Sequence, residues 1–276
     1  MPLRLLNAAF ASKNRAIHEL SSAETLARIA TSDVSLSRFG DGEFKYVFLE
    51  RGLRFQKWDQ RLARRLEDAL MADSATVLRC FNFYFRDHKQ VEWLSHFERY
   101  GRRFPQFKSI RQNDDIGLLR RGRESRVYRR YWRIVQAETD SKEYGEASVF
   151  FLGTYVKAYE RGEIEMVLEK FRTLFRGKRV LFVAPDKPLG GPSFAALEPE
   201  LKKIGMRSAQ FLPIPSENAF DAMEQIEAGI AARTGFDEVF IQAGPVATVL
   251  AFELPAKLGV RVLDVGSLNT QIRHLV

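Results

Sequence analysis

The second half of the chain alternates strand-like and helix-like segments at short intervals, and this alternation limits the fold more than any other feature. Strands are expected at residues 179–184, 208–214, 238–243 and 260–265. They are nearly continuous runs of apolar residues, the pattern of strands covered on both faces. Helices are expected between them, at residues 194–204, 219–232 and 246–254. Such repeats fold as a mostly parallel sheet flanked by helices, a Rossmann-like α/β architecture.

The first half of the chain begins in the same way and then changes character. Residues 34–39 alternate apolar and polar side chains as a strand does, residues 59–71 carry an apolar stripe at helical spacing, and residues 75–81 form a second strand-like run. The segment at about residues 83–145 is rich in aromatic residues and arginine, and we expect a helical subregion there. The sequence thus predicts a single domain over residues 1–276 with this helical insertion inside it.

Composition narrows the class of protein further. Apolar residues make up 45% of the chain, which is ordinary for a folded globule, and no apolar run approaches the roughly 18–20 residues of a membrane span. Cys80 is the only cysteine, so an intramolecular disulfide is impossible and a reducing compartment, the cytoplasm, is expected. Cys80 lies in an apolar run, which predicts a buried and unreactive thiol.

The charge of the chain is positive and unevenly distributed. There are 43 lysine and arginine residues against 35 aspartate and glutamate residues, a formal net charge of +8. Much of the excess lies between Arg99 and Arg133. A basic run is either an ordinary solvated face or a patch that attracts a phosphate-bearing substrate or an anionic membrane, and the sequence leaves both interpretations open.

The strongest candidate for chemistry is the turn after the first regular strand, at residues 38–43, which reads RFGDGE. Its two glycines let the backbone turn sharply and approach a ligand closely. Asp41 and Glu43 offer hard oxygen ligands that suit Mg²⁺ or Mn²⁺ beside substrate phosphates. Arg38 can pair with those phosphates or hold a carboxylate in place. The alternative is a polar turn in which Glu43 only favours the start of a helix.

Two further turns follow expected strands and precede expected helices. At Gly244–Thr248, Pro245 takes the first helical position, and the next N–H groups and the Thr248 hydroxyl form a potential anion site, although a turn without a ligand has the same pattern. Asn218 either caps a helix or presents its amide to a nucleobase or a ribose. Parallel strands bring such turns to the carboxyl edge of the sheet, where ligands bind.

Several common catalytic signatures are missing from the sequence. The Gly- and Pro-rich loop at residues 186–193 matches neither a P-loop nor a G-x-G-x-x-G fingerprint. The four histidines have no metal-ligand spacing, and no G-x-S-x-G elbow is present. A zinc site and a serine-hydrolase triad are therefore not expected.

Taken in order, these motifs resemble the glycosyltransferases with the GT-D fold, a family first catalogued as a domain of unknown function. The resemblance spans about residues 34–269 and rests on Ser37-Arg38-Phe39-Gly40-Asp41-Gly42-Glu43, Phe55-Gln56 with Asp59, Asn218-Ala219-Phe220, Gly244-Pro245-Val246-Ala247-Thr248-Val249-Leu250-Ala251 and Leu263-Asp264-Val265-Gly266. It implies a Rossmann-like sugar-transfer enzyme with an Asp-x-Glu motif and a divalent metal, Mn²⁺ or Mg²⁺. The implied donor is a nucleotide sugar, with a UDP-sugar expected, and the implied reaction inverts the anomeric carbon.

The resemblance also implies roles for individual residues. Asp41 and Glu43 are the expected catalytic and metal-binding pair. The residues expected to lie against the donor are Arg38, Gly40, Gly42, Asn218, Gly244, Pro245 and Thr248. The expected acceptor is a glycan, a glycoprotein or a lipid-linked molecule, and peripheral contact with a membrane is compatible with it, whereas no nucleic acid is expected. The base that accepts the hydroxyl proton stays open, with Glu217 and Asp264 as candidates at strand exits.

A second hypothesis has no catalysis in it. The chain would then be a basic α/β module that binds nucleic acid or an anionic surface through Arg99–Arg133. Such binding is steeply salt-dependent, which distinguishes it from sugar transfer. No recognised nucleic-acid-binding signature accompanies the basic run, so sugar transfer is the preferred hypothesis.

Overall fold

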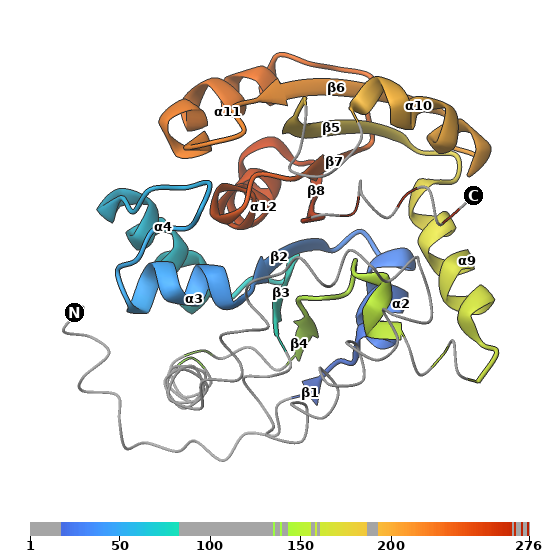
Figure 1. Cartoon of the computed structure of the whole chain (residues 1–276), viewed down its shortest axis with the longest axis horizontal. Coiled ribbons are helices and arrows are strands. Elements are labelled where there is room, and N and C mark those ends of the chain that lie inside the picture. The colour runs from blue at the N-terminus through green and yellow to red at the C-terminus, as the bar shows by residue number, and fades with distance from the viewer. Residues whose placement is uncertain are drawn as a thin grey trace.

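The computed structural model of the chain describes residues 18–82, 135, 139, 143–155, 158, 161–186, 193–266, 268, 272 and 275, and for Asp41, Leu152 and Gly153 it describes only the backbone. The described residues form one sheet of eight strands in the order β1-β4-β3-β2-β8-β7-β5-β6, in which every neighbouring pair is parallel (Figure 1). The strands are β1 (His18–Glu19), β2 (Ser35–Phe39), β3 (Val77–Phe81), β4 (Glu143–Glu146), β5 (Arg179–Pro185), β6 (Ser208–Ile214), β7 (Glu238–Ile241) and β8 (Arg261–Asp264).

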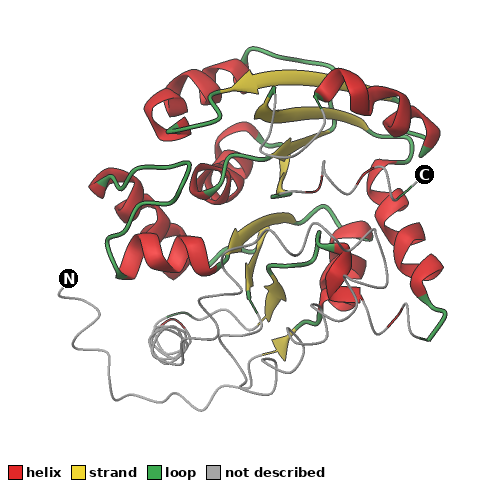
Figure 2. Ribbon diagram, in the orientation of Figure 1, coloured by secondary structure: helices red, strands yellow, loops and turns green. Residues whose placement is uncertain are grey.

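Helices cover both faces of this sheet (Figure 2). The α-helices are α2 (Ser22–Ala30), α3 (Asp41–Phe48), α4 (Gln60–Met71), α9 (Ile164–Phe175), α10 (Phe194–Lys203), α11 (Met223–Ala231) and α12 (Pro245–Leu258). Two short 3₁₀ helices are η3 (Leu152–Tyr155) and η4 (Ala219–Ala222). None of the helices within the described ranges combines the length and the apolarity needed to cross a bilayer.

Each face of the sheet has its own apolar core. Alternate side chains of a strand point to opposite faces, so Leu181 and Val183 of β5 join the core under α3, α4, α11 and α12, whereas Val180 and Phe182 join the core under α2, α9 and α10. The apolar stripe predicted at residues 59–71 is buried as expected, as is most of α12. Cys80 is fully buried, which confirms the predicted burial of its thiol.

The α/β fold with a parallel sheet is confirmed, and the boundaries of three helices differ from the sequence prediction. After the acidic turn the sequence predicts a helix from Phe44 to Leu49, but helix α3 begins already at Asp41, because Gly40 and Glu43 together form its N-terminal cap. The segment predicted as one helix from residue 219 is a 3₁₀ turn followed by α11. Helix α12 continues past residue 254 through Pro255, because its buried side holds it in place.

The predicted helical subregion lies almost entirely outside the described residues. Its last part, from Glu143, is strand β4 and not helix. The sequence prediction missed this strand because Glu143–Glu146 is short and its polar ends break the apolar run. Burial of Tyr144 against the ring of Phe81 fixes it in the sheet.

Candidate functional site

The turns that the sequence singled out gather at the carboxyl edge of the parallel sheet, where the strands β2, β6, β7 and β8 end. Strand β2 leads directly into α3, β6 into η4 and β7 into α12. In sheets of this type this edge is where ligands bind, since no helix covers the loops there. The side chains at these strand ends therefore form the candidate site.

The acidic turn is the first turn of α3. Gly40 is the residue before the helix, and its N–H donates a hydrogen bond of 2.9 Å to Oε2 of Glu43. A Cβ atom on Gly40 would lie 3.1 Å from the same oxygen, so glycine gives the carboxylate room to fold back over the turn. Asp41 is the first residue of α3, and its side chain lies outside the described part of the structure. A Cβ atom on Gly42 would lie 3.2 Å from Cδ1 of Leu53.

Both interpretations of Glu43 are compatible with this geometry. As a helix cap, the carboxylate stabilises the N–H groups and the positive end of α3. A carboxylate also has about four lone-pair sites on two oxygens, so accepting one N–H does not prevent it from binding a cation. Asp and Glu oxygens are the donor set that Mg²⁺ and Mn²⁺ prefer, and in that respect the residues fit the implied metal. No cluster of three His, Cys, Asp or Glu side chains occurs among the residues that the structure describes.

Arg38 is fixed inside the site by contacts to two other strands. Its Nη1 donates to the carbonyl of Ala147, just after β4, at 2.8 Å, and its Nη2 donates to Oδ1 of Asp264, at the end of β8, at 3.2 Å. The guanidinium also lies against the Cα of Gly266, where any Cβ would meet Nη2 at 2.0 Å. About a fifth of the side chain stays exposed at the edge of the sheet. Of the two roles considered for Arg38, the described contacts are those of a group paired with a carboxylate.

Asp264 organises this corner of the site from a buried position. Its Oδ1 accepts from Arg38 and from the N–H of Gly266, and its Oδ2 lies 3.3 Å from Oγ1 of Thr248. Burial raises the pKa of the Asp264 carboxyl above its ordinary value, although the contacts with Arg38, Gly266 and Thr248 act in the opposite direction. Both oxygens are engaged, so Asp264 serves better to position Arg38 than to accept a proton from a substrate.

The Thr248 hydroxyl is used inside the protein. It donates to the backbone carbonyl of Arg38 at 2.9 Å, and the carbonyl of Thr248 accepts from Ser37 at 2.8 Å. The N–H groups of Ala247 and Thr248 turn back to the carbonyl of Gly244. An anion at the start of α12 would therefore have to compete for most of the donors that the sequence suggested. Thr248 joins α12 to β2, and in this way it connects two of the predicted site segments.

Asn218 connects the turn after β6 to the loop between α3 and α4. It precedes η4 in a left-handed conformation (φ 52°), and its side chain makes no capping hydrogen bond, so the alternative of a plain helix cap is wrong. Instead, its Oδ1 accepts from the N–H of Lys57 at 2.9 Å, and its own N–H donates to the carbonyl of Phe55 at 2.8 Å. Its amide oxygen is thus occupied by the protein backbone.

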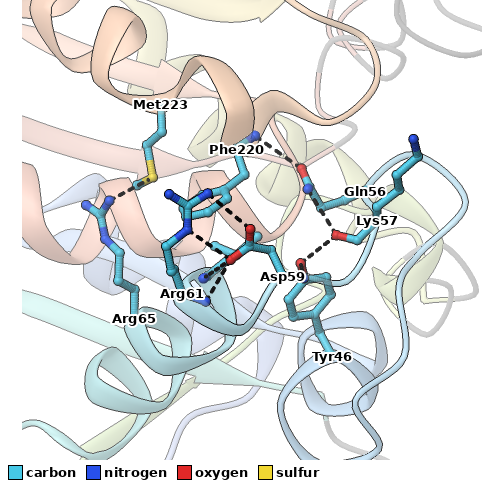
Figure 3. Close-up of polar contacts among 9 residues, drawn as sticks. Tyr46, Gln56, Lys57, Asp59, Arg61, Arg65, Phe220 and Met223 are labelled. Atoms are coloured by element: carbon cyan, nitrogen blue, oxygen red, sulfur yellow. Dashed lines mark hydrogen bonds and ion pairs between the residues drawn. The ribbon is translucent and has the colours of Figure 1, made fainter.

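The loop between α3 and α4, residues 49–59, has further anchors that the sequence did not reveal. The buried Gln56 accepts from the N–H of Phe220 at 3.2 Å, and Tyr46 of α3 donates to the carbonyl of Lys57 at 2.6 Å (Figure 3). The N–H of Asp59 donates to the Tyr46 hydroxyl at 2.6 Å. These contacts hold the loop across the ends of β6 and β7. The pair Phe55-Gln56 entered the sequence prediction only through the family resemblance.

Gly244 and Pro245 form the sharp turn between β7 and α12. Gly244 has a positive φ of 55°, and a Cβ there would lie 2.2 Å from Cε2 of Phe55, so only glycine fits. Pro245 takes the first helical position, as predicted. The site residues therefore fall into two groups, Arg38 with Thr248 on one side and Asn218 with Gly244 on the other, and α3 begins beside them.

Two other acidic side chains lie at this edge of the sheet. The sequence suggested one of them as the base and gave no sign of the other. Glu217, a candidate base, is exposed in the turn before η4. Glu146, at the end of β4, is a buried carboxylate that the sequence analysis did not single out, and its Oε1 accepts from the N–H and the hydroxyl of Ser148. Only the sheet topology, which puts β4 two strands from β2, brings Glu146 near the site.

A small apolar recess lies at the ends of β5, β7 and β8, on the side of α10. Its lining includes Phe182, Phe194, Phe240 and Gln242. Oε1 of Gln242 is buried and has no hydrogen-bond partner within the described ranges. The described lining residues of the recess include no cationic side chain. The basic run Arg99–Arg133, on which the second hypothesis depends, lies outside the described residues.

Sequence comparison finds a known family whose model matches most of the chain. The family model described as Glycosyltransferase GT-D fold matches residues 36–272, which include every predicted site residue. Two curated relatives are similar at low identity: "Probable glycosyl transferase Gly" of Streptococcus gordonii is 24% identical over 94% of this chain, and "Glycosyltransferase GlyD" of Streptococcus pneumoniae serotype 4 is 23% identical over 90%. The chain spans 33% and 26% of the lengths of these two relatives.

Solved structures share the fold. One, described as the highly conserved domain of unknown function 1792 with a distinct glycosyltransferase fold, has a TM-score of 0.67 and 20% identity, and the match covers 98% of this chain and 83% of that one. Another, described as a new glycosyltransferase from Streptococcus sanguinis, has a TM-score of 0.63 and 20% identity, with 93% and 84% covered. At this identity the match bears on the fold alone, and it agrees with the parallel sheet described above.

Proposed function

The chain belongs to the family of glycosyltransferases with the GT-D fold, and from this premise we propose that it transfers a sugar, with inversion, from a UDP-sugar to a hydroxyl of a glycan, a glycoprotein or a lipid-linked acceptor. The observation that carries the proposal is the position of the acidic turn. Asp41 and Glu43 stand in the first turn of α3, directly after β2, at the carboxyl edge of a parallel sheet within the family match. Names of the relatives agree with sugar transfer.

The proposed reaction moves one bond at the anomeric carbon. The acceptor oxygen forms a bond to that carbon while the bond to the donor's diphosphate oxygen breaks, and the acceptor's proton passes to a base. The nucleoside diphosphate leaves with one more negative charge, so the site must stabilise charge on the leaving group. A divalent cation such as Mn²⁺ or Mg²⁺, if bound there, would supply this stabilisation as a Lewis acid.

The chain's own residues have distinct parts in this proposal. Asp41 and Glu43 would hold the metal with their carboxylate oxygens. The N–H of Gly40 keeps Glu43 folded toward the turn, through the 2.9 Å hydrogen bond described above. Arg38 is held at the same edge by Asp264 and Ala147, where its partly exposed guanidinium adds positive charge beside the diphosphate.

The first prediction tests the acidic turn. We expect UDP with Mn²⁺ to raise the melting temperature of the wild type by several degrees, since ligand at 100 times its Kd stabilises a protein by about 2.7 kcal/mol. Asp41→Asn and Glu43→Gln should abolish this Mn²⁺-dependent shift and lower donor hydrolysis about 100-fold or more, the order of loss when one charge-stabilising group is removed. The measurements are thermal unfolding and the release of UDP from UDP-sugars.

A matched control is available in α2. Glu24 has the same position in a capping box as Glu43, and its Oε2 accepts from the N–H of Ser21 at 2.7 Å. Glu24→Gln should cost about as much stability as Glu43→Gln while the response to UDP and Mn²⁺ stays unchanged. If Glu43→Gln behaves like Glu24→Gln, Glu43 is only a helix cap and the metal assignment fails. If no nucleoside diphosphate stabilises the wild type with or without metal, the proposed donor fails.

A further inference from the structure

The loop between α3 and α4 holds an aromatic ring at the carboxyl edge of the sheet without using it in either core. Phe55 is half-buried, and it belongs neither to the two apolar clusters nor to the apolar residues packed against them in the described structure. Its neighbours in sequence, Arg54 and Lys57, are exposed. An apolar ring at such a position gains little from folding compared with a core residue, so another reason for its placement is needed.

The loop is anchored by hydrogen bonds on both sides of Phe55. The carbonyl of Phe55 accepts from Asn218, and the N–H of Lys57 donates to the same residue. Gln56 is buried and binds the N–H of Phe220, while its backbone N–H and carbonyl pair with Leu53 (Figure 3 shows the Gln56 and Lys57 contacts). The backbone at Phe55 is therefore fixed, and the position of its ring is determined before any ligand binds.

The ring lies where two strand ends meet. Asn218 follows β6 and Gly244 follows β7, and the Phe55 ring contacts the Cα of Gly244 so closely that no side chain would fit there. Position 244 therefore requires glycine, because the positive φ and the contact with the ring both exclude a side chain there. The same loop also reaches the start of α3, because Cδ1 of Leu53, two residues before Phe55, lies 3.2 Å from where a Cβ atom on Gly42 would be.

We infer that Phe55 is the stacking platform for the nucleobase of the donor, with the diphosphate extending from it toward the first turn of α3. The inference rests on the proposed function and adds to it a residue for base recognition. Stacking on an aromatic face stabilises the binding of any planar nucleobase, whichever hydrogen-bonding groups the base carries. The positive charges of Arg54 and Lys57 on either side of Phe55 suit a phosphorylated ligand. The loop anchors then serve to keep the platform in place.

The test separates base recognition from phosphate binding. Kd values of UDP and of inorganic pyrophosphate, each with Mn²⁺, are measured by calorimetry for the wild type, Phe55→Leu and Phe55→Tyr. Phe55→Leu should weaken UDP about tenfold, the effect of losing one base–aromatic stack, and leave pyrophosphate within about twofold. Phe55→Tyr keeps the ring and should keep UDP affinity within about twofold. Phe48→Leu is the matched control, because Phe48 packs against the core on α3; it should leave both Kd values unchanged.

Several results would overturn the inference, and they differ from failure of the proposed function. Equal weakening of UDP and pyrophosphate by Phe55→Leu would mean that the ring only supports the fold of the site. Unchanged UDP affinity in Phe55→Leu would mean that the base lies elsewhere. In both cases the wild type still binds UDP with metal, so the proposed donor stands. If the wild type binds pyrophosphate but no nucleoside diphosphate, the site does not recognise a nucleobase. The proposed donor and the role of Phe55 would then both be wrong.

Discussion

At the scale of single residues, the contact between Asp264 and Thr248 explains why a buried carboxyl group is tolerated beside the site. Oγ1 of Thr248 lies 2.9 Å from the carbonyl of Arg38 and 3.3 Å from Oδ2 of Asp264, and as a donor to the carboxylate it favours the charged form, as Arg38 does. Burial acts against these contacts and is the larger effect, because it raises the pKa of Asp264. An asparagine has a similar shape and carries no charge, and its amide oxygen can still accept from Arg38.

The second prediction concerns the pH dependence of this residue. A folded-state pKa above the unfolded value of about 3.9 means that the stabilisation by Asp264 is complete below that value and is lost as pH rises through the folded pKa. Asparagine does not titrate. The free energy of unfolding of the wild type minus that of Asp264→Asn should therefore fall as pH rises from about 4. Urea unfolding at a series of pH values measures this difference. A difference that increases with pH would mean that the ion pair with Arg38 outweighs burial.

At the scale of elements, Tyr46 of α3 is the main support of the loop that carries Phe55. The phenol is fully buried; it donates to the carbonyl of Lys57 and accepts from the N–H of Asp59, the residue that caps α4. Burial raises the pKa of Tyr46 to about 12, so the hydroxyl keeps its proton through neutral and moderately alkaline pH. One side chain thus joins the end of α3, the loop and the start of α4.

The third prediction removes this support. Tyr46→Phe should lower the free energy of unfolding by about 1–3 kcal/mol, because the buried N–H of Asp59 loses its acceptor. Hydrogen exchange of the Asp59 amide should become faster. The control is Tyr155→Phe: this hydroxyl also bonds backbone carbonyls, those of Val149 and Ser22, but on the other face of the sheet. The control should lose comparable stability without changing exchange at Asp59. Unchanged exchange in Tyr46→Phe would contradict the role assigned to Tyr46.

At the scale of the whole molecule, the sheet consists of two four-strand halves that meet at the pairing of β2 with β8. Arg261 on β8 reaches across this junction. Its guanidinium donates to Glu238 of β7 at 2.8 Å, to the carbonyl of Val34 before β2 at 3.1 Å, and to the carbonyl of Ile29 in α2. The Arg261 side chain is 8% exposed and that of Glu238 2% exposed, so the two form a buried ion pair within one half, and the bonds from Arg261 to the carbonyls of Val34 and Ile29 join this half to the other.

The fourth prediction tests whether the halves unfold together. Arg261→Met should lower the free energy of unfolding by about 3 kcal/mol, because it leaves Glu238 with only Lys178 as a partner and two carbonyls without a donor. Helix α12 still packs on β2 and β8 from one face, so unfolding should stay a single transition in circular dichroism and in fluorescence. Lys178→Met, which removes the more exposed partner of Glu238, should cost less. Two separated transitions in Arg261→Met would show that the contacts of Arg261 are what couples the halves.

The sequence by itself determined the parallel α/β architecture and most of the strands, because a strand buried on both faces must be apolar and the residues that turn the chain must be glycine or proline. It also located the acidic turn at the end of β2 and the turn at Gly244, since both follow from local chain geometry. These features depend on residues close together in the chain, so they can be read from one segment at a time.

Tertiary structure decided which of these segments meet and what each side chain contacts. Asn218 had the pattern of a helix cap, but it bonds a loop 161 positions away in sequence, and Arg38 pairs with a carboxylate 226 positions away. The short strand β4, the buried Glu146 and the placement of Phe55 on Gly244 have no local signal either. Such contacts depend on the order of strands in the sheet, and that order is set by packing of the whole chain rather than by any one segment.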